Sequence, residues 1–402
     1  MTAVAPAPTA AAALDPRPSR WLGAPAPGGL ALPAAAPNAS QLYAPRGVWL
    51  DEARVVAVDS GNHRVLLWRG LPDADHCDAD VVLGQPDRTT EGPHAGGRGV
   101  RGGLHLPTGV CVADGRLIVA DAWHHRLLVW DGVPDRDDAP PAWAIGQRTL
   151  DDDLPNAGRG AGAAHATGLY WPYGVAWCDG WLWVADTGNR RVLGWHGVPA
   201  PGRAPDVVLG QPDAASNAER RGGATTADGF RWPHAIATTT DADGAPQLLV
   251  ADAGLHRVLG WSPAPRGDAP ATLVLGQRDL GSAVETPHVA QGPRALRFPY
   301  GLACADRVTC VADTANNRVL VWDAPLPADG AAVPASHVLG QPDFDAAGEN
   351  RWTAVRHDTL CWPYGLACRA FPDGAIRLAV ADSGNNRVVL WTLRDSRPPT
   401  PA

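Results

Sequence analysis

The stretch "VADSGNNRVVLW", residues 380–391, decides the fold. In it an aspartate is followed, after four residues, by an arginine, and the arginine opens an apolar run that ends in tryptophan. The phrase occurs six times with small changes, at intervals of 61 to 69 residues, and its aspartates are Asp59, Asp121, Asp186, Asp252, Asp313 and Asp382. Self-similarity at a nearly fixed spacing is typical of repeat architectures. The chain therefore contains six copies of one unit.

Each copy predicts four short strands. The first begins at a proline, as in "PYGLAC" (299–304), and the second ends at the aspartate, as in "RLAVAD" (377–382). The third runs from the arginine to the tryptophan, and the fourth is a short run such as "VVLG" (81–84). Apolar and β-branched runs bounded by Gly, Pro, Asn and Asp are typical of strands. Four-stranded units repeated around an axis predict an all-β, six-bladed β-propeller, which hides its sheet edges by closing the ring.

The closure of the ring is also predicted from the sequence. After each of the first five copies the fourth strand ends in Gly-Gln, at Gln85, Gln147, Gln211, Gln277 and Gln341. After the sixth copy only "TLRDSRPPTPA" remains, while "RWLGAP" at 20–25 resembles the missing strand. We therefore expect an N-terminal outer strand to close the last blade, with the propeller over 20–392 and disordered tails at 1–19 and 393–402.

The phrases "DSGNHRV" (59–65) and "DSGNNRV" (382–388) resemble the NHL repeat, and the resemblance covers about residues 20–392. It implies a six-bladed propeller but does not settle function, because such relatives include RNA-binding domains, protein scaffolds and lyases.

Composition narrows the class of protein. The chain has 402 residues, is 45% hydrophobic and 19% charged, and carries a formal charge of −8. These values indicate a globular protein without a general attraction to nucleic acid or anionic membranes. No apolar run approaches the roughly 18 residues of a membrane helix, and the seven cysteines form no CxxC pair. We expect a soluble, cytoplasmic protein with reduced thiols, and neither nucleic acid nor membrane as a partner.

The features common to all copies are interpreted as structural. A single active site would not need six Asp–Arg pairs, whereas an ion pair that stabilises a strand junction would be needed in every copy. His63, His125 and His256 precede the arginine in three copies, but Asn317 and Asn386 occupy the same position in others. The sequence therefore assigns these histidines to architecture.

The copies diverge at two positions beside the proline that opens the first strand. Two residues before it stand Tyr43, His105, Tyr170, Arg231, Arg297 and Cys361. One residue after it stand Arg46, Thr108, Tyr173, His234, Tyr300 and Tyr364. All five tyrosines of the chain fall in these two positions, and the innermost strands of a propeller line its central channel. We expect these side chains to surround one mouth of the channel, either as a binding site or as a plug.

This mouth predicts the chemistry of a small-molecule site. His234, Tyr173, Tyr300, Tyr364 and Cys361 are the catalytic candidates, as acid or base, hydrogen-bond donors and nucleophile. Arg46, Arg231 and Arg297 suit a carboxylate or phosphate, and Tyr43, Tyr170 and Thr108 would complete the lining. Catalysis of a lyase or hydrolase type and simple binding of a small, anionic ligand both stay open at this point.

A metal ion is compatible with these residues. The peptidyl-hydroxyglycine amidating lyase, a propeller that this chain distantly resembles, holds zinc with histidines at the position of His234 in alternate blades. Here the alternate positions are Thr108 and Tyr364, so a three-histidine zinc site at that level is not supported. His234 and His105 stay candidates for a single divalent or transition metal ion, and further donors are His94, His165, His288, His357 and Cys361.

The alternative function is a protein-interaction scaffold. Segments of roughly 20 residues separate each Gly-Gln from the next proline, and long loops in compact folds often carry binding surfaces. Trp123 and Trp352 lie on the same predicted face. Because aromatic side chains dominate interface hot spots, these two would anchor a protein partner.

Overall fold

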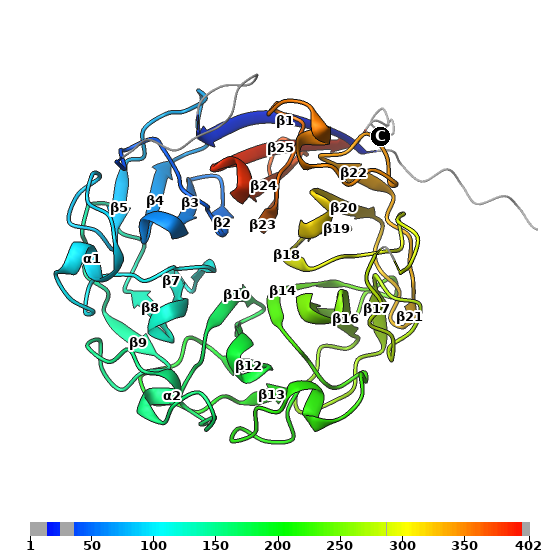
Figure 1. The fold of residues 1–402 in the computed structure, drawn as a ribbon, viewed down its shortest axis with the longest axis horizontal. Helices are drawn as coiled ribbons and strands as arrows, with labels where there is room; N and C mark the ends of the chain where they lie inside the picture. Colours follow the sequence, from blue (N-terminus) through cyan, green and yellow to red (C-terminus); the bar gives the residue numbers. More distant parts are fainter. Residues whose placement is uncertain (1–13, 25–35, 287, 396–402) are drawn as a thin grey trace, which may run out of the picture.

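The computed structural model describes residues 14–24, 36–286 and 288–395, which form a ring of six sheets around a central axis (Figure 1). Each sheet is one blade with its first strand innermost. The all-β, six-bladed propeller predicted from the sequence is therefore confirmed.

The strands of the first three blades follow one another in chain order. Blade 1 comprises β2 (Gly47–Leu50), β3 (Arg54–Asp59), β4 (Arg64–Arg69) and β5 (Val81–Leu83). Blade 2 comprises β6 (Val110–Ala113), β7 (Arg116–Asp121), β8 (Arg126–Trp130) and β9 (Trp143–Ile145). Blade 3 comprises β10 (Pro172–Cys178), β11 (Trp181–Asp186), β12 (Arg191–His196) and β13 (Val207–Leu209).

The other three blades repeat the plan with two additions. Blade 4 comprises β14 (Pro233–Thr240), β15 (Pro246–Asp252), β16 (Arg257–Trp261) and β17 (Leu273–Leu275), and the two-residue β21 (Gly330–Ala331) extends it in parallel. Blade 5 comprises β18 (Pro299–Ala305), β19 (Val308–Asp313), β20 (Arg318–Asp323) and β22 (His337–Leu339). Blade 6 comprises β23 (Pro363–Ala370), β24 (Ile376–Asp382), β25 (Arg387–Asp395) and β1 (Leu14–Gly23).

Helical structure in the described residues is confined to single turns. A 3-10 turn joins the second and third strands of every blade: η1 (Ser60–Asn62), η2 (Ala122–His124), η3 (Thr187–Asn189), η5 (Ala253–Leu255), η6 (Thr314–Asn316) and η8 (Ser383–Asn385). The segments that precede the prolines contain α1 (Pro93–Gly97), α2 (Pro155–Gly158), η4 (Glu219–Gly222) and η7 (Glu349–Trp352). None of the helices described is long and apolar enough to cross a membrane.

The middle strands are apolar between their end residues because both faces of each blade are covered by neighbouring blades. In β3, for example, all residues after the first are buried. The apolar clusters run from one blade to the next, as in the cluster that joins Trp49, Val119 and Val184 of three blades. Packing of sheet against sheet therefore forms the core of the ring.

The Asp–Arg pair has the structural role expected from its sixfold repetition. Arg64 Nε lies 2.7 Å from Asp59 Oδ2, both side chains are fully buried, and the guanidinium also donates to the carbonyls of Arg88, Asn38 and Gln41. Buried pairs also join Asp121–Arg126, Asp186–Arg191, Asp252–Arg257, Asp313–Arg318 and Asp382–Arg387. Each pair ties a long segment to the strand junction of its own blade, and its hydrogen bonds offset the cost of burying the charges.

The histidines that precede the arginines have a structural role too. His63 adopts the left-handed conformation (φ 55°), and its Nδ1 accepts a hydrogen bond from the Leu106 backbone N–H of the next blade at 3.0 Å. His125 and His256 accept equivalent bonds from Trp171 and Phe298. Asn317 does so with its side-chain oxygen for Trp362, so histidine and asparagine make the same bond between blades here.

The N-terminal strand closes the ring as predicted, but it is longer than expected. β1 pairs antiparallel with β25 from Leu14↔Asp395 to Gly23↔Arg387. Leu14 is buried in an apolar cluster with Leu393 and Ile376, and this packing stabilises the part of β1 that precedes the predicted start of the strand. Residues 14–19 and 393–395, which we expected in the tails, therefore belong to blade 6, and the rest of both expected tails lies outside the described residues.

Candidate functional site

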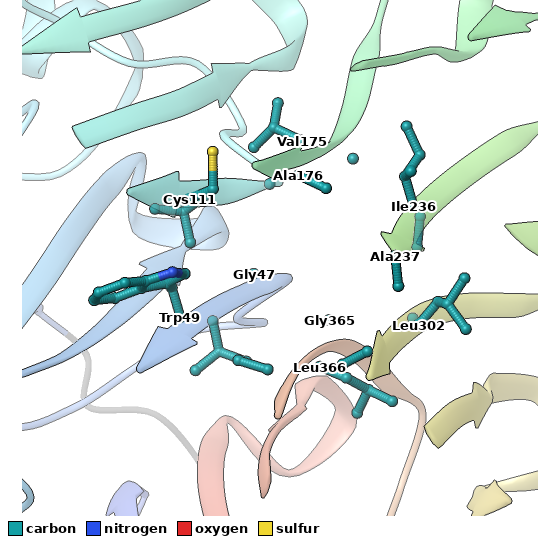
Figure 2. A pocket seen from close by; sticks show the side chains of 18 of the residues that line it. Gly47, Trp49, Cys111, Val175, Ala176, Ile236, Ala237, Leu302, Gly365 and Leu366 are labelled. Atoms are coloured by element: carbon teal, nitrogen blue, oxygen red, sulfur yellow. The ribbon is translucent and has the colours of Figure 1, made fainter. Parts of the chain in front are cut away.

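The six inner strands surround a central channel with a volume of about 210 Å³. Side chains such as Trp49, Cys111, Ile236 and Leu302 gather around it from different blades (Figure 2). Its mouth is formed by the six residues that follow the strand-opening prolines: Arg46, Thr108, Tyr173, His234, Tyr300 and Tyr364. The structure thus brings together, at the channel, the six residues that the sequence analysis placed there.

The side chains of this mouth form a nearly continuous ring. The ring centroids of Tyr173 and His234 are 4.5 Å apart, those of His234 and Tyr300 also 4.5 Å, and those of Tyr300 and Tyr364 4.7 Å. The Arg46 guanidinium carbon lies 5.4 Å from the centroid of the Tyr364 ring. Aromatic contacts at these distances are favourable and hold the side chains in place.

The spacing of the ring is set by the residue that comes next in each strand. In five blades this residue is glycine, and a Cβ added there would lie 2.0 to 2.5 Å from the carbonyl oxygen of the mouth residue in the next blade: Gly47, Gly109, Gly174, Gly301 and Gly365. In blade 4 the residue is Ala235. The inner strands therefore approach so closely that five of the six positions exclude any side chain.

His234 is neutral at physiological pH. Burial lowers its pKa to about 4, and the positive charge of Arg46 acts in the same direction. The hydrogen bond to the Trp232 carbonyl oxygen raises the pKa but does not reverse the shift. Nδ1 lies 3.1 Å from that oxygen, which can only accept, so Nδ1 carries the proton and Nε2 carries the lone pair. The only group of three potential metal ligands in the described part of the chain does not include His234.

Tyr300 and Tyr364 are protonated phenols. Burial raises the pKa of Tyr300 to about 12, helped by the neighbouring Tyr364 and Tyr173. Burial also raises the pKa of Tyr364, although Arg46 acts in the opposite direction. These residues can therefore donate hydrogen bonds but do not supply a phenolate at neutral pH.

The residues two positions before the prolines lie elsewhere. The structure describes all six, and none lines the channel: Tyr43, His105, Tyr170, Arg231, Arg297 and Cys361. Their backbone N–H groups bind the aspartate of their own blade, as Tyr43 does with Asp59 Oδ1 at 2.6 Å. The two positions therefore do not form the single site that the sequence suggested.

Only one of the three candidate arginines is free for a ligand. Arg231 pairs with Glu219 at 3.4 Å, and Arg297 pairs with Glu285 at 3.5 Å. The Arg46 guanidinium makes no hydrogen bond or ion pair with any described residue. An anionic group at the mouth would therefore meet Arg46 alone.

Cys361, the candidate nucleophile, is shifted away from the thiolate that such a role requires. Burial raises the pKa of its thiol to about 12, and the negative charges of Asp382 and Glu349 act in the same direction. Arg387 opposes them without reversing the shift. The side chain lies against Gly384 of its own turn, outside the channel, so it is a packed thiol rather than a nucleophile at the mouth.

A wider pocket of about 930 Å³ adjoins the mouth between blades 5 and 6. It shares Tyr300 and Tyr364 with the channel mouth. Its outer wall contains Trp362 and Trp352, and the latter is 81% exposed. Aromatic walls with a few polar groups are typical of small-molecule pockets of this size.

His105 belongs to a separate cluster in blade 2. The ligand nitrogens of His94, His105 and His124 all lie within 4.8 Å of one another. His165, His288 and His357, the other loop histidines considered as donors, are not part of it. The sequence analysis did not identify His124, because it occupies a repeat position that is asparagine in most other copies and looked like an ordinary substitution. The change from asparagine to histidine at this position was the only signal that could have identified it.

The NHL repeat family model matches residues 104–130, which cover blade 2 from its opening segment to the end of β8. The match covers part of one of the six four-stranded blades. No curated protein sequence matches the chain significantly.

Solved structures resemble this chain only in fold. Virginiamycin B lyase from Staphylococcus aureus is 10% identical, with a TM-score of 0.42 over 87% of this chain and 94% of the other. Regucalcin from Agrobacterium tumefaciens is 11% identical, with a TM-score of 0.45 over 91% and 96%. Aldose sugar dehydrogenase from Streptomyces coelicolor is 13% identical, with a TM-score of 0.47 over 95% and 99%. Function has to be inferred from the residues of this chain.

Proposed function

We propose that this protein binds a small organic ligand at the channel mouth, with an apolar or aromatic body against the tyrosine rings and an anionic group on Arg46. The observation that carries the proposal is the ring of Tyr173, His234, Tyr300 and Tyr364 that ends in an unpaired guanidinium. Guanidinium groups bind carboxylates and phosphates with strong, directional hydrogen bonds. The adjoining pocket supplies room for a ligand larger than the channel itself.

The state of His234 favours binding over strong base catalysis. Its Nε2 lone pair can accept a hydrogen bond from a ligand hydroxyl or amine. A base with a pKa of about 4 removes protons weakly at neutral pH, because efficient general bases have a pKa near the working pH. Catalysis of a lyase or hydrolase type at the same site is the less favoured alternative. It would use His234 Nε2 as the base and the neutral Tyr300 and Tyr364 as proton donors.

The test combines ligand identification with matched variants. Small molecules released from the purified protein are identified by mass spectrometry, and aromatic carboxylates and phosphate monoesters are titrated by calorimetry. Arg46→Gln is expected to weaken binding by at least about 10-fold, the loss of one charge-assisted hydrogen bond. Arg231→Gln is the matched control, because that arginine lies outside the channel and pairs with Glu219.

The pH dependence gives an independent readout. Because the pKa of His234 is lowered to about 4, the residue stays neutral above pH 5, and binding of an aromatic carboxylate, whose charge is constant over this range, is expected to be flat between pH 6 and 8. Equal effects of Arg46→Gln and Arg231→Gln, or no effect of Arg46→Gln together with Tyr300→Phe, would show that the mouth is not the site.

A protein-interaction role is the second candidate, supported by one observation. Trp352 is 81% and Trp362 51% exposed, on one side of the same face. Exposed tryptophans are frequent anchors of protein interfaces. Trp352→Ala should then abolish capture of a defined partner while leaving ligand binding by Arg46 intact, whereas retained capture would rule out this anchor.

A further inference from the structure

Three histidines of blade 2 come from separate segments and meet on the loop side of the ring. His94 lies in α1, His105 two residues before Pro107, and His124 at the end of η2. The ring centroid of His124 is 4.9 Å from that of His94 and 5.5 Å from that of His105. A tetrahedral zinc ion with bonds of about 2.0–2.1 Å needs ligand nitrogens roughly 3.4 Å apart. One ring nitrogen of each histidine lies within 4.8 Å of those of the other two, and the rings of His94 and His124, stacked at an interplanar angle of 12°, must turn for both lone pairs to point at one ion.

His124 is the best prepared of the three. Its side chain is 1% exposed, and Nδ1 lies 2.7 Å from Asp121 Oδ2. Asp121 also pairs with Arg126 at 2.9 Å and is therefore the accepting carboxylate, so Nδ1 carries the proton. In the neutral imidazole the lone pair is then on Nε2, which is buried and has no hydrogen-bond partner among the described atoms. A carboxylate behind a histidine is the arrangement that orients histidine ligands in metal sites.

Comparison of the blades shows what the histidine adds. Four blades carry asparagine at this position, and each amide donates to the aspartate of its own blade: Asn62, Asn189, Asn316 and Asn385. The bond to the aspartate therefore does not require histidine. What distinguishes blade 2 is a second ring nitrogen, Nε2, which is buried without a hydrogen-bond partner. It belongs to a ring that packs against the rings of His94 and His105.

The other two ligands are placed by the backbone. The Leu104 carbonyl accepts a hydrogen bond from the His94 N–H at 3.3 Å, and a Cβ at Gly103 would lie 2.5 Å from the His94 carbonyl carbon. The absence of a side chain at Gly103 lets the His94 segment close over blade 2. His63 lies near His105 but is not a ligand, because its Nδ1 accepts from Leu106 and its Nε2 must then carry the proton.

We propose that His94, His105 and His124 form a three-histidine site for a divalent transition-metal ion, with Asp121 orienting His124. Neutral imidazoles suit zinc, copper and nickel rather than magnesium or calcium. Because His94 and His105 are half-buried while His124 is fully buried, a fourth position stays open to solvent. Three protein ligands and one open position are typical of zinc ions that bind an exchangeable water or ligand. The site is separate from the channel mouth and does not depend on the ligand proposed there.

The test uses the full chain, freed of metal with a chelator and titrated with Zn²⁺. We expect one Zn²⁺ per chain with submicromolar affinity and a rise of the melting temperature on binding. His124→Asn is the decisive variant, because asparagine keeps the bond to the aspartate in four other blades but lacks the second nitrogen. It should weaken Zn²⁺ binding by at least about 100-fold while the metal-free melting temperature stays unchanged.

Controls separate this site from general binding to histidines. His94→Gln and His105→Gln change half-buried side chains and should each weaken binding by about 10-fold or more. His196→Gln, an exposed histidine on blade 3, should leave it unchanged. Equal Zn²⁺ affinity of the wild type and His124→Asn, or the absence of a 1:1 site in the wild type, would overturn the proposal.

Discussion

At the scale of single residues, the left-handed position before each buried arginine joins one blade to the next. In five blades its side chain tolerates positive φ and offers an acceptor, as histidine and asparagine do. Arg190 of blade 3 has no acceptor, and the Trp232 N–H of the next blade turns to Asp252 Oδ1 at 2.9 Å instead. That carboxylate is also the one whose arginine, Arg257, lies farthest away, at 3.4 Å. The loss of one inter-blade bond is therefore visible in the neighbouring ion pair.

Substitution of Asn317 tests this role. The Asn317 side chain accepts from the Trp362 N–H at 2.9 Å and donates to the Ala347 carbonyl at 2.9 Å. Asn317→Ala should lower the free energy of unfolding by about 1–3 kcal/mol, because a buried N–H loses its acceptor. Asn317→His, the residue of three other blades, should cost less than half as much. Urea unfolding measures both, and equal losses for the two variants would contradict the acceptor role.

The positions of individual side chains at the candidate site were the hardest feature to predict from the sequence. Divergence between copies identified both variable positions, but not that their side chains lie in different places. Arg231 and Arg297 are neutralised by Glu219 and Glu285, which come from loops whose course depends on packing rather than on the repeat. His94 and His124 are 30 residues apart and meet only because the loop folds back over its blade.

At the scale of elements, the inner strands are positioned by a contact between backbones. Gly174 of β10 faces the carbonyl oxygen of His234, and a Cβ would lie 2.3 Å from it. Gly174→Ala should therefore push β10 and β14 apart and lower the free energy of unfolding by about 1–3 kcal/mol. The change should also disturb the stacking of Tyr173 on His234, and ligand affinity at the mouth should fall with it.

The matched control is the blade that already carries alanine. Ala235→Gly removes a methyl group where no glycine is required, and should cost no more than about 1 kcal/mol. Thermal unfolding and ligand titration of both variants measure the difference. If Gly174→Ala is as mild as Ala235→Gly, the close approach of the inner strands does not set the spacing of the mouth.

The strands themselves could be predicted because their signals are local. An aspartate, a turn and an arginine recur at each strand junction, and apolar runs mark strands buried on both faces. The prediction failed at the start of β1, where Pro16 and Pro18 interrupt the expected pattern. Proline lacks a backbone N–H, but an edge strand has one side without a partner, so the outermost strand of a blade accommodates it. The structure therefore begins the strand at Leu14 rather than at Arg20.

At the scale of the whole molecule, the ring depends on a strand from the far end of the chain. Trp21 of β1 is fully buried, its Nε1 donates to the Ala24 carbonyl, and its ring covers the guanidinium of Arg387 at 4.1 Å. Removal of residues 1–23 would withdraw Leu14, Trp21 and Leu22 from the core, each worth about 1.5–3 kcal/mol. It would also expose β25 as an unpaired edge.

We therefore expect the truncated chain to melt at least about 10 °C lower than the full chain and to aggregate. A synthetic peptide of residues 14–24, added in excess, should restore the melting temperature, because it replaces the missing strand without a covalent link. A peptide of the same composition in scrambled order should not, since the pairing from Leu14↔Asp395 to Gly23↔Arg387 depends on register. An unchanged melting temperature after truncation would mean that the ring is held by its other five interfaces alone, and that the strand from the N-terminus covers the last blade without closing it.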